Sequence, residues 1–306
     1  MTPRGKDFLN IADTSKEEIE FLLDQVPVYK EILSRPIKKV PALRGKTIVT
    51  LFYEPSTRTR MSFELAGKRL NADVSNIAVS TSAVAKGENL KDTIRTIESM
   101  EVDAVVIRHS QAGAPHMAAK YTKMSVINAG DGAHEHPTQA LLDLYTILEK
   151  KKTIKGLKIG IVGDIAHSRV AKSDILGLKK LGADVTCIAP PTLMPPFMEK
   201  FGVSVEHNLN KVISDLDVLY ILRLQLERQS KGLFPSISEY INLYGIDKKR
   251  LGLCKKDVLI MHPGPMNIGL EVSEEAATSL SSAITEQVAN GVAVRMALLN
   301  HLLGGN

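Results

Sequence analysis

The sequence predicts an α/β fold made of two doubly wound parallel-sheet α/β domains joined by interdomain helices. The chain has 306 residues, more than a single hydrophobic core usually contains. Short β-branched segments alternate with helical segments, a pattern typical of parallel βαβ units. The alternation is interrupted near residue 150 and then starts again, which indicates a second domain of the same kind.

The first half of the chain is expected to contain an opening helix and three strand–helix pairs. Ser15-Lys16-Glu17-Glu18 has the capping-box pattern, and apolar residues follow it at helical spacing. Strands are expected at 48–52, 104–108 and 125–130. The helix that follows the last of these strands, over 137–150, would connect the two domains.

The second half repeats the strand–helix alternation. The charged run 149–152 and Gly156 separate the two series of elements. Further strands are expected at 158–165, 183–190, 203–207, 217–223 and 257–263. We therefore place the first domain at residues 1–137 and the second at 138–287, and we expect a C-terminal helix over 288–306 to pack back on the first domain.

The composition favours a protein that binds small anions. The formal net charge is +5, but Lys and Arg are dispersed, Trp is absent and aromatic residues make up only 5%, so nucleic-acid binding is not expected. Cys187 and Cys254 are too few for a disulfide framework and lack the spacing of a zinc site. No apolar run is long enough to span a membrane, so we expect a cytoplasmic protein.

One segment has the pattern of a phosphate site. Ser56-Thr57-Arg58-Thr59-Arg60 follows a predicted strand and begins a predicted helix, where unpaired backbone N–H groups and the helix dipole favour an anion. The hydroxyl groups add donors, and the Arg58 guanidinium matches phosphate oxygens. The alternative is an ordinary helix cap with two surface arginines. The whole pattern after a strand favours the phosphate site of a small substrate.

Two competing phosphate motifs do not fit. Gly45-Lys46-Thr47 is similar to the end of a P-loop, but the earlier glycine position holds Val40. Gly160 and Gly163 are similar to part of a dinucleotide fingerprint, but the next strand ends in Ala189-Pro190-Pro191 without an acidic residue for a ribose. A nucleotide is therefore not the expected ligand.

The segment from Ser56 to Arg60 resembles the carbamoyl-phosphate signature of the aspartate and ornithine carbamoyltransferases. Further matches follow along nearly the whole chain, in the order of the family: Ser82-Ala83-Val84-Ala85-Lys86-Gly87-Glu88, Arg108-His109, His136-Pro137-Thr138-Gln139, Gly163-Asp164 with Arg169, Arg223-Leu224-Gln225 with Glu227-Arg228, and His262-Pro263-Gly264-Pro265. The combination is highly specific. It implies a carbamoyl-phosphate-binding first domain, an aspartate-binding second domain and a reaction without a metal or an organic cofactor.

Particular residues favour the aspartate branch of this family. The aspartate enzymes carry a Ser and a Lys before Gly-Glu in a loop, which Ser82 and Lys86 match, whereas the ornithine enzymes lack this lysine. The ornithine enzymes also have His-Cys-Leu-Pro and Ser-Met-Gly motifs, which are absent here. The resemblance implies carbamoyl transfer to the α-amine of L-aspartate in pyrimidine biosynthesis; the alternative is transfer to ornithine or another amine.

The resemblance also implies roles for the matched residues. The carbamoyl phosphate ligands would be Ser56, Thr57, Arg58, Thr59, Arg108, His136, Gln139, Gly264 and Pro265. The aspartate ligands would be Lys86, Arg169, Arg223 and Gln225, and the catalytic residues Arg58, Lys86, Arg108 and His136. Arg108 and His136 would approach the carbonyl oxygen, and Gln139 would orient the carbamoyl NH₂. Either aspartate-site arginine taken alone is more often a surface ion-pair partner, and His136 taken alone could be a helix-capping histidine.

The resemblance bears on assembly as well. The loop with Ser82 and Lys86 reaches the neighbouring subunit's site in the family, which implies a homotrimer with shared sites and leaves a regulatory chain or a dihydroorotase as possible partners. His134-Glu135-His136 lacks the spacing of a His-Glu-x-x-His zinc motif, so no metal is expected. Ile268 departs from the family, whose members usually have Arg there. A non-catalytic relative or a nucleic-acid-binding module is the alternative from another class.

Overall fold

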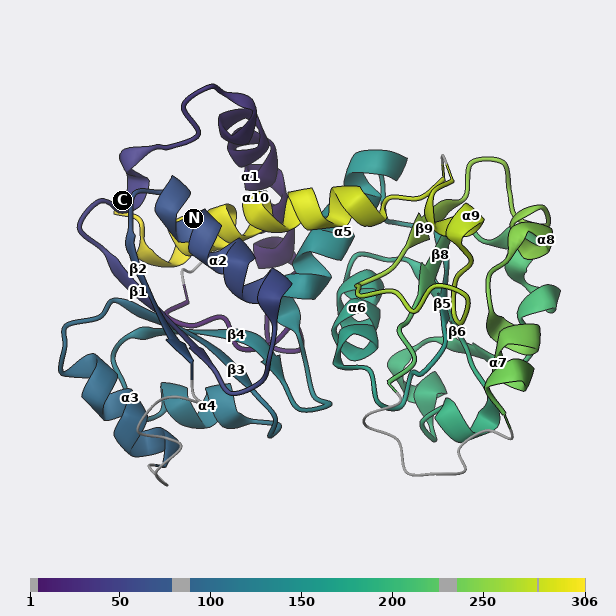
Figure 1. The fold of residues 1–306 in the computed structure, drawn as a ribbon, viewed down its shortest axis with the longest axis horizontal. Coiled ribbons are helices and arrows are strands. Elements are labelled where there is room, and N and C mark those ends of the chain that lie inside the picture. Colours follow the sequence, from purple (N-terminus) through teal and green to yellow (C-terminus); the bar gives the residue numbers. More distant parts are fainter. Residues whose placement is uncertain (1–4, 79–88, 226–235, 280, 306) are drawn as a thin grey trace. The chain divides into compact units, whose positions relative to one another are not determined.

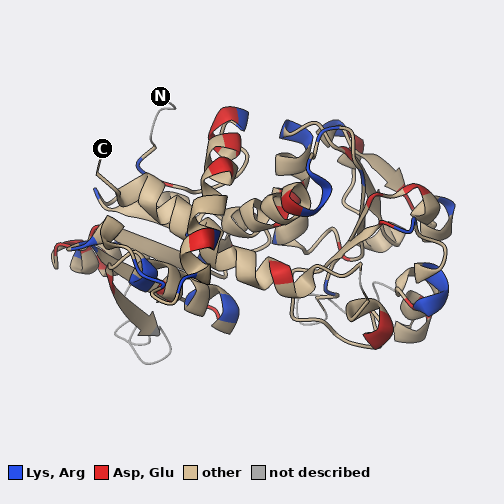
Figure 2. Cartoon of the chain, turned by 90° about the horizontal axis from the view of Figure 1, so that it is seen from above, with Lys and Arg blue, Asp and Glu red and all other residues tan. Residues whose placement is uncertain are grey.

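The computed structural model describes residues 5–78, 89–225, 236–279 and 281–305. They form two compact units: unit 1 contains Met1–Tyr145 and Val288–Asn306, and unit 2 contains Thr146–Gln287. Each unit holds a parallel sheet with helices, so the predicted fold class is confirmed (Figure 1). Figure 2 shows Lys and Arg on many separate helices and loops, interspersed with Asp and Glu. Among the described residues, no helix combines the length and the apolar character that a bilayer crossing requires.

Unit 1 has a four-stranded sheet of order β2-β1-β3-β4, in which all pairings are parallel. Its strands are β1 (Thr47–Phe52), β2 (Asp73–Ala78), β3 (Ala104–His109) and β4 (Ser125–Asp131). Its helices are α1 (Lys16–Ser34), α2 (Thr57–Arg69), α3 (Leu90–Glu98), α4 (Ala114–Ala119) and the larger parts of α5 (Pro137–Lys151) and α10 (Ile284–Leu303), with a 3₁₀ turn at Pro41–Leu43. The sequence pattern does not predict β2.

Alternate side chains of the unit 1 strands form two cores. Val49, Leu51, Val105 and Ile107 face one core cluster together with residues of α3 and α4, as the period of two along a strand requires. By the same alternation the intervening residues face the other side, and α2 packs against β1 and β2. There Gly67 of α2 leaves room for Val74 and Ile48, because an added Cβ would lie 2.6 Å from the Val74 side chain.

Unit 2 has a five-stranded parallel sheet of order β7-β6-β5-β8-β9. The strands are β5 (Lys158–Val162), β6 (Asp184–Ile188), β7 (Ser204–Glu206), β8 (Val218–Ile221) and β9 (Leu259–Met261), each at a predicted position. The helices are α6 (Arg169–Lys180), α7 (Ile237–Tyr244), α8 (Lys248–Leu251) and α9 (Glu274–Ala277), and 3₁₀ turns lie at Pro191–Leu193, Met198–Phe201, Leu209–Lys211 and Ile213–Asp215.

Both sheets have a topological switch point. In unit 1 the strand order reverses between β1 and β3, and in unit 2 it reverses between β5 and β8. Open α/β sheets bind ligands beyond the carboxyl ends of the strands at such a point, because the connections there diverge to opposite faces. The segments that follow β1, β3, β5 and β8 are therefore the places to look for a site.

Candidate active site

The phosphate segment lies at the switch point of unit 1. Ser56 is the N-cap residue of α2, which begins at Thr57 directly beyond β1. The Ser56 side chain makes no capping hydrogen bond, whereas Ser15 and Asn89 cap α1 and α3. The first N–H groups of a helix have no partner within it, so this end of α2 offers donors and a positive dipole to an anion. Thr57 and Arg58 are exposed beside it, and Thr59 is buried.

Arg108 ends β3 on the other side of the switch point. Its Cα lies opposite Phe52 of β1, and its backbone oxygen accepts a hydrogen bond of 2.8 Å from the Tyr53 N–H. Its Nε donates to Glu54 and one Nη to the Ala129 carbonyl, both at 3.3 Å. Glu54, whose role no sequence pattern indicated, thus anchors the guanidinium next to the α2 N-terminus.

His109, the residue after Arg108, is tied into the same edge of the sheet. Its Nδ1 accepts a hydrogen bond of 2.9 Å from the Gln111 N–H, and its ring lies 4.4 Å from the Tyr53 ring, measured between centroids. Burial lowers the pKa of His109 below its usual value, although the negative charges of Glu54 and Asp131 raise it. The folded chain therefore favours neutral His109.

This shift predicts a pH dependence of stability. The folded chain binds a proton on His109 less readily than the unfolded chain, whose histidine pKa is about 6.5. The resulting stabilisation is present above that value and is lost as the pH falls toward the folded pKa. Urea unfolding between pH 7 and 5 should show a larger loss of unfolding free energy for the wild type than for His109→Gln. Equal losses in the two proteins would contradict this prediction.

His136 and Gln139 lie at the start of α5. His136 precedes the first helical residue, is 4% exposed, and its carbonyl accepts the N–H groups of Gln139 and Ala140 at 3.0 and 3.2 Å. His136 thus lies at the N-terminus of α5. The preceding Glu135, considered from the sequence only as a possible metal ligand, is 2% exposed and accepts the Ile11 N–H at 2.7 Å, so it holds the N-terminal segment against this turn.

The turn before His136 is organised by Asp131, the last residue of β4. Its fully buried carboxylate accepts hydrogen bonds from the Gly113 N–H at 2.7 Å, from the Asn128 amide at 2.9 Å and from the Glu135 N–H at 3.2 Å. His134 Nδ1 lies 3.0 Å from the same carboxylate. Asp131 thereby fixes the path of the chain from β4 into α5.

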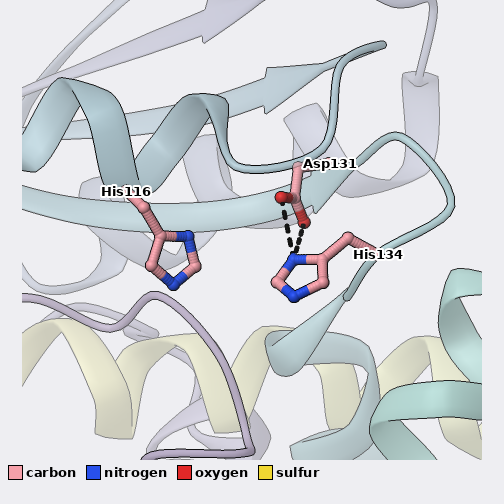
Figure 3. A group of neighbouring side chains, drawn as sticks. All are labelled: His116, Asp131 and His134. Atoms are coloured by element: carbon pink, nitrogen blue, oxygen red, sulfur yellow. Dashed lines mark hydrogen bonds and ion pairs between the residues drawn. The ribbon is translucent and has the colours of Figure 1, made fainter.

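Asp131 also belongs to a group of possible metal ligands. Figure 3 shows it beside His116 and His134, and one ligand atom of each residue lies within 4.8 Å of the others. The group differs from the His134-Glu135-His136 run considered in the sequence, because His116 comes from α4. Donors already surround both oxygens of Asp131, which is the environment of a structural carboxylate rather than of an open metal ligand.

In unit 2 the predicted aspartate ligands lie at the switch point of the second sheet. Arg169 is the first residue of α6 and is 4% exposed, and Ser168 caps this helix by accepting the Ala171 N–H at 3.1 Å. Arg223 and Gln225 follow β8 and are half-buried. Strands β5 and β8 are hydrogen-bonded neighbours, so the segments that follow them begin side by side.

Gly163 permits this close approach. Its φ is +124°, which favours glycine, and an added Cβ would lie 3.2 Å from the Cβ of Leu222, the residue before Arg223. A hydrogen bond of 2.8 Å from the Leu222 N–H to the Val162 carbonyl continues the pairing of the two strands. The loops with the two predicted arginines are thus packed together at the end of one sheet.

The His-Pro-Gly-Pro loop of unit 2 follows β9. His262 is buried; its Nδ1 accepts the Gly264 N–H at 2.8 Å, so its Nε2 carries the hydrogen and donates to Glu271 at 3.2 Å. The Gly264–Pro265 peptide bond is cis. Ile268 lies just beyond, with 51% of its surface exposed.

A pocket of about 420 Å³ in unit 2 contains none of the predicted ligands and is lined by residues such as Asn210, Asn242, Asp247 and Arg250. Ser82, Lys86, Glu227 and Arg228 lie outside the described residues. Among the described residues, Arg169, Arg223 and Gln225 therefore lie in unit 2, and the predicted carbamoyl phosphate ligands lie in unit 1, except Gly264 and Pro265, which belong to unit 2.

Fold and site define a two-domain α/β enzyme with predicted anion ligands at the switch point of each sheet. The chain belongs to the aspartate/ornithine carbamoyltransferase family, and the resemblance is confirmed: the family's profile for the carbamoyl-P binding domain matches residues 6–149, and that for the Asp/Orn binding domain matches residues 155–302. The aspartate carbamoyltransferase catalytic subunit of Syntrophomonas wolfei is 57% identical over 98% of this chain and 96% of its own. The subunit of the same name from Moorella thermoacetica is 57% identical over 100% and 99%.

Solved structures agree with this family. An aspartate transcarbamoylase from Trypanosoma cruzi in complex with carbamoyl phosphate has a TM-score of 0.90 and 32% identity, over 98% of this chain and 97% of its own. The ornithine carbamoyltransferase from Pyrococcus furiosus has a TM-score of 0.87 and 31% identity, over 99% and 98%. The fold is thus shared by enzymes with different acceptors, and the acceptor must be inferred from the sequence relatives and the site.

Proposed function

We propose that the chain transfers the carbamoyl group of carbamoyl phosphate to the α-amine of L-aspartate, giving N-carbamoyl-L-aspartate and phosphate, a step of pyrimidine biosynthesis. One observation carries this proposal: each sheet presents predicted anion ligands at its switch point, the α2 N-terminus with Arg108 in unit 1 and Arg169 with Arg223 in unit 2. Two anionic substrates are what this reaction requires.

In the proposed reaction the amine nitrogen attacks the carbonyl carbon of carbamoyl phosphate. The new N–C bond forms, the C–O bond to phosphate breaks, and the amine proton passes to the departing phosphate. Holding two reactants in the right geometry can contribute about 7–11 kcal/mol, so positioning is the main device. Arg108 and His136 would stabilise the charge that develops on the carbonyl oxygen.

Most of the proposed ligands follow the predicted division of the chain, whereas Gln139, Gly264 and Pro265 belong to residues 138–287 and Lys86 to residues 1–137. Residues 1–137 with the helix 288–306 would bind the phosphate through Ser56, Thr57, Arg58 and Thr59, and Gln139 would bind the carbamoyl NH₂. Residues 138–287 would bind aspartate through Arg169, Arg223 and Gln225, because guanidinium groups bind carboxylates in bidentate fashion. Gly264 and Pro265 are retained as carbamoyl phosphate ligands, and Lys86 as an aspartate ligand and a catalytic residue.

The test of this function is a steady-state assay with carbamoyl phosphate and a panel of amines, in which the ureido product is measured. We expect turnover with L-aspartate. Turnover with ornithine and none with aspartate would support the alternative, an ornithine-type carbamoyltransferase. The similarity to the Pyrococcus furiosus enzyme is the reason to test this alternative.

The proposal includes a cytoplasmic homotrimer in which Ser82 and Lys86 act in the site of a neighbouring copy. The loop resemblance supports the shared site, and the free thiols of Cys187 and Cys254 suit a reducing compartment. A regulatory chain or a dihydroorotase would be an additional partner. The proposal includes neither nucleic acid nor a membrane as a partner.

Shared sites predict complementation between two inactive variants. In trimers mixed at equal amounts from Lys86→Ala and Arg58→Ala chains, about one quarter of the sites would combine an intact Arg58 with a neighbour's intact Lys86. Activity should therefore rise to roughly a quarter of the wild-type value after subunit exchange. Mixing without recovery, while mass analysis shows hybrid trimers, would contradict the shared site.

A further inference from the structure

Gln139 has a buried carboxylate one helical turn behind it. Its Nε2 donates to the two carboxylate oxygens of Asp143 at 3.2 and 3.1 Å, and the two residues are 9% and 2% exposed. An ionised carboxylate can only accept hydrogen bonds, so it selects the amide orientation in which the NH₂ group faces Asp143. The amide oxygen of Gln139 must then point away from Asp143.

Arg295 of α10 supplies a positive charge near Asp143. Its side chain is fully buried, and its pKa is lowered to about 10 by that burial, although attraction to Asp143 opposes the shift. Arg295 therefore stays charged at neutral pH. A buried carboxylate is stabilised in its ionised form by such a charge, which keeps Asp143 an acceptor.

Arg295 also connects the two helices of the proposed carbamoyl phosphate site. One Nη donates to the Ser62 hydroxyl of α2 at 2.9 Å, and the other donates to the Thr138 hydroxyl of α5 at 3.4 Å. The guanidinium carbon lies 5.0 Å from the centroid of the Phe63 ring. Arg295 is therefore bonded both to Thr138, the neighbour of Gln139, and to α2, whose first turn contains the phosphate segment.

We propose that Asp143 and Arg295 are positioning residues that act through Gln139, turning its amide oxygen toward the substrate so that the site selects an N–H donor. This inference rests on the proposed function, in which Gln139 binds the carbamoyl NH₂. It assigns a specificity to the site: carbamoyl phosphate is preferred over acetyl phosphate, which has a methyl group of similar size in place of NH₂. Sites built to hydrogen-bond a substrate group discriminate strongly against analogues that lack it.

The test is Asp143→Asn. An asparagine can donate to the Gln139 oxygen and so permits the reversed amide. We expect kcat/KM for carbamoyl phosphate to fall by about 10-fold or more, while the inhibition constants of acetyl phosphate and inorganic phosphate change by less than about 2-fold. An unchanged kcat/KM, or an equal weakening of all three ligands, would overturn the inference.

A double-mutant cycle separates positioning from a merely structural role. In a Gln139→Ala background, Asp143→Asn should cause no further loss of selectivity, because the residue through which it acts is gone. The same additional loss in both backgrounds would overturn the proposal. Asp24→Asn, an exposed change of the same kind on α1, is the matched control and should leave all constants unchanged.

A further variant distinguishes a loss of stability from a loss of selectivity for carbamoyl phosphate. If Asp143→Asn leaves Arg295 buried without its counter-charge and destabilises the chain, the double variant Asp143→Asn with Arg295→Met removes both charges. The selectivity loss must persist in this variant, and its absence there would overturn the inference. Wild-type protein without turnover of carbamoyl phosphate and aspartate would contradict the proposed function instead.

Discussion

Replacement of Arg58 by Ala is expected to lower kcat by about 10²–10³-fold, the usual cost of losing one preorganised donor to a developing charge. Arg58 is exposed in the first turn of α2, where the Ser56 side chain makes no capping hydrogen bond. The phosphate leaves with increased negative charge, so the guanidinium stabilises the transition state more than the bound substrate. Steady-state kinetics with saturating aspartate would measure this loss.

The matched control is Arg69→Ala, which removes an arginine from the last turn of the same helix. We expect kcat to stay within about 2-fold of the wild type, because surface charges away from a site contribute little. A wild-type kcat in Arg58→Ala would mean that the N-terminus of α2 acts without the Arg58 guanidinium. An Arg69→Ala loss of the same size would mean that the helix, and not Arg58, is the sensitive feature.

Local sequence patterns were sufficient for most strands but not for β2. Residues 73–78 carry Asp, Ser and Asn, and β2 is an edge strand whose Asp73, Ser75 and Asn76 side chains are exposed. An edge strand does not need two apolar faces, so the continuous apolar run that reveals a buried parallel strand is absent. What fixes β2 is its parallel register with β1, from Thr47 opposite Asp73 to Phe52 opposite Ala78, and no local pattern carries that information.

The candidate site shows the same division between local and distant information. The position of Ser56 to Arg60 at a helix start after a strand followed from the sequence, because helix caps are local. Glu54 beside Arg108 and Arg295 beside Thr138 are separated by 54 and 157 residues, so only the folded chain reveals them. The contact of Asp143 with Gln139 could have been predicted from the sequence, because the two residues are four apart on one helix face, the spacing at which helical side chains meet.

Replacement of Arg223 by Ala is expected to lower kcat/KM for aspartate by about 10²–10³-fold. A bidentate contact with a carboxylate consists of two charge-assisted hydrogen bonds, each contributing about 1.5–3 kcal/mol. Arg223 follows β8 at the switch point of unit 2, where Gly163 and Leu222 hold the two loops together. Initial rates at varied aspartate would show the loss as an increased KM, and Arg223→Lys should recover it only in part, because an ammonium lacks the planar pair of donors.

The same variant separates the two substrates of the proposed reaction. Arg223 belongs to unit 2 and the phosphate segment to unit 1, so the inhibition constant of inorganic phosphate should remain within about 2-fold of the wild type. Lys249→Ala in α8 removes another cation of unit 2 and should change neither constant. Weakened phosphate binding in Arg223→Ala with unchanged KM for aspartate would reverse the assignment of the two anion sites. An aspartate-specific loss would instead establish that a dicarboxylate, rather than the cationic side chain of ornithine, is what the switch point of unit 2 recognises.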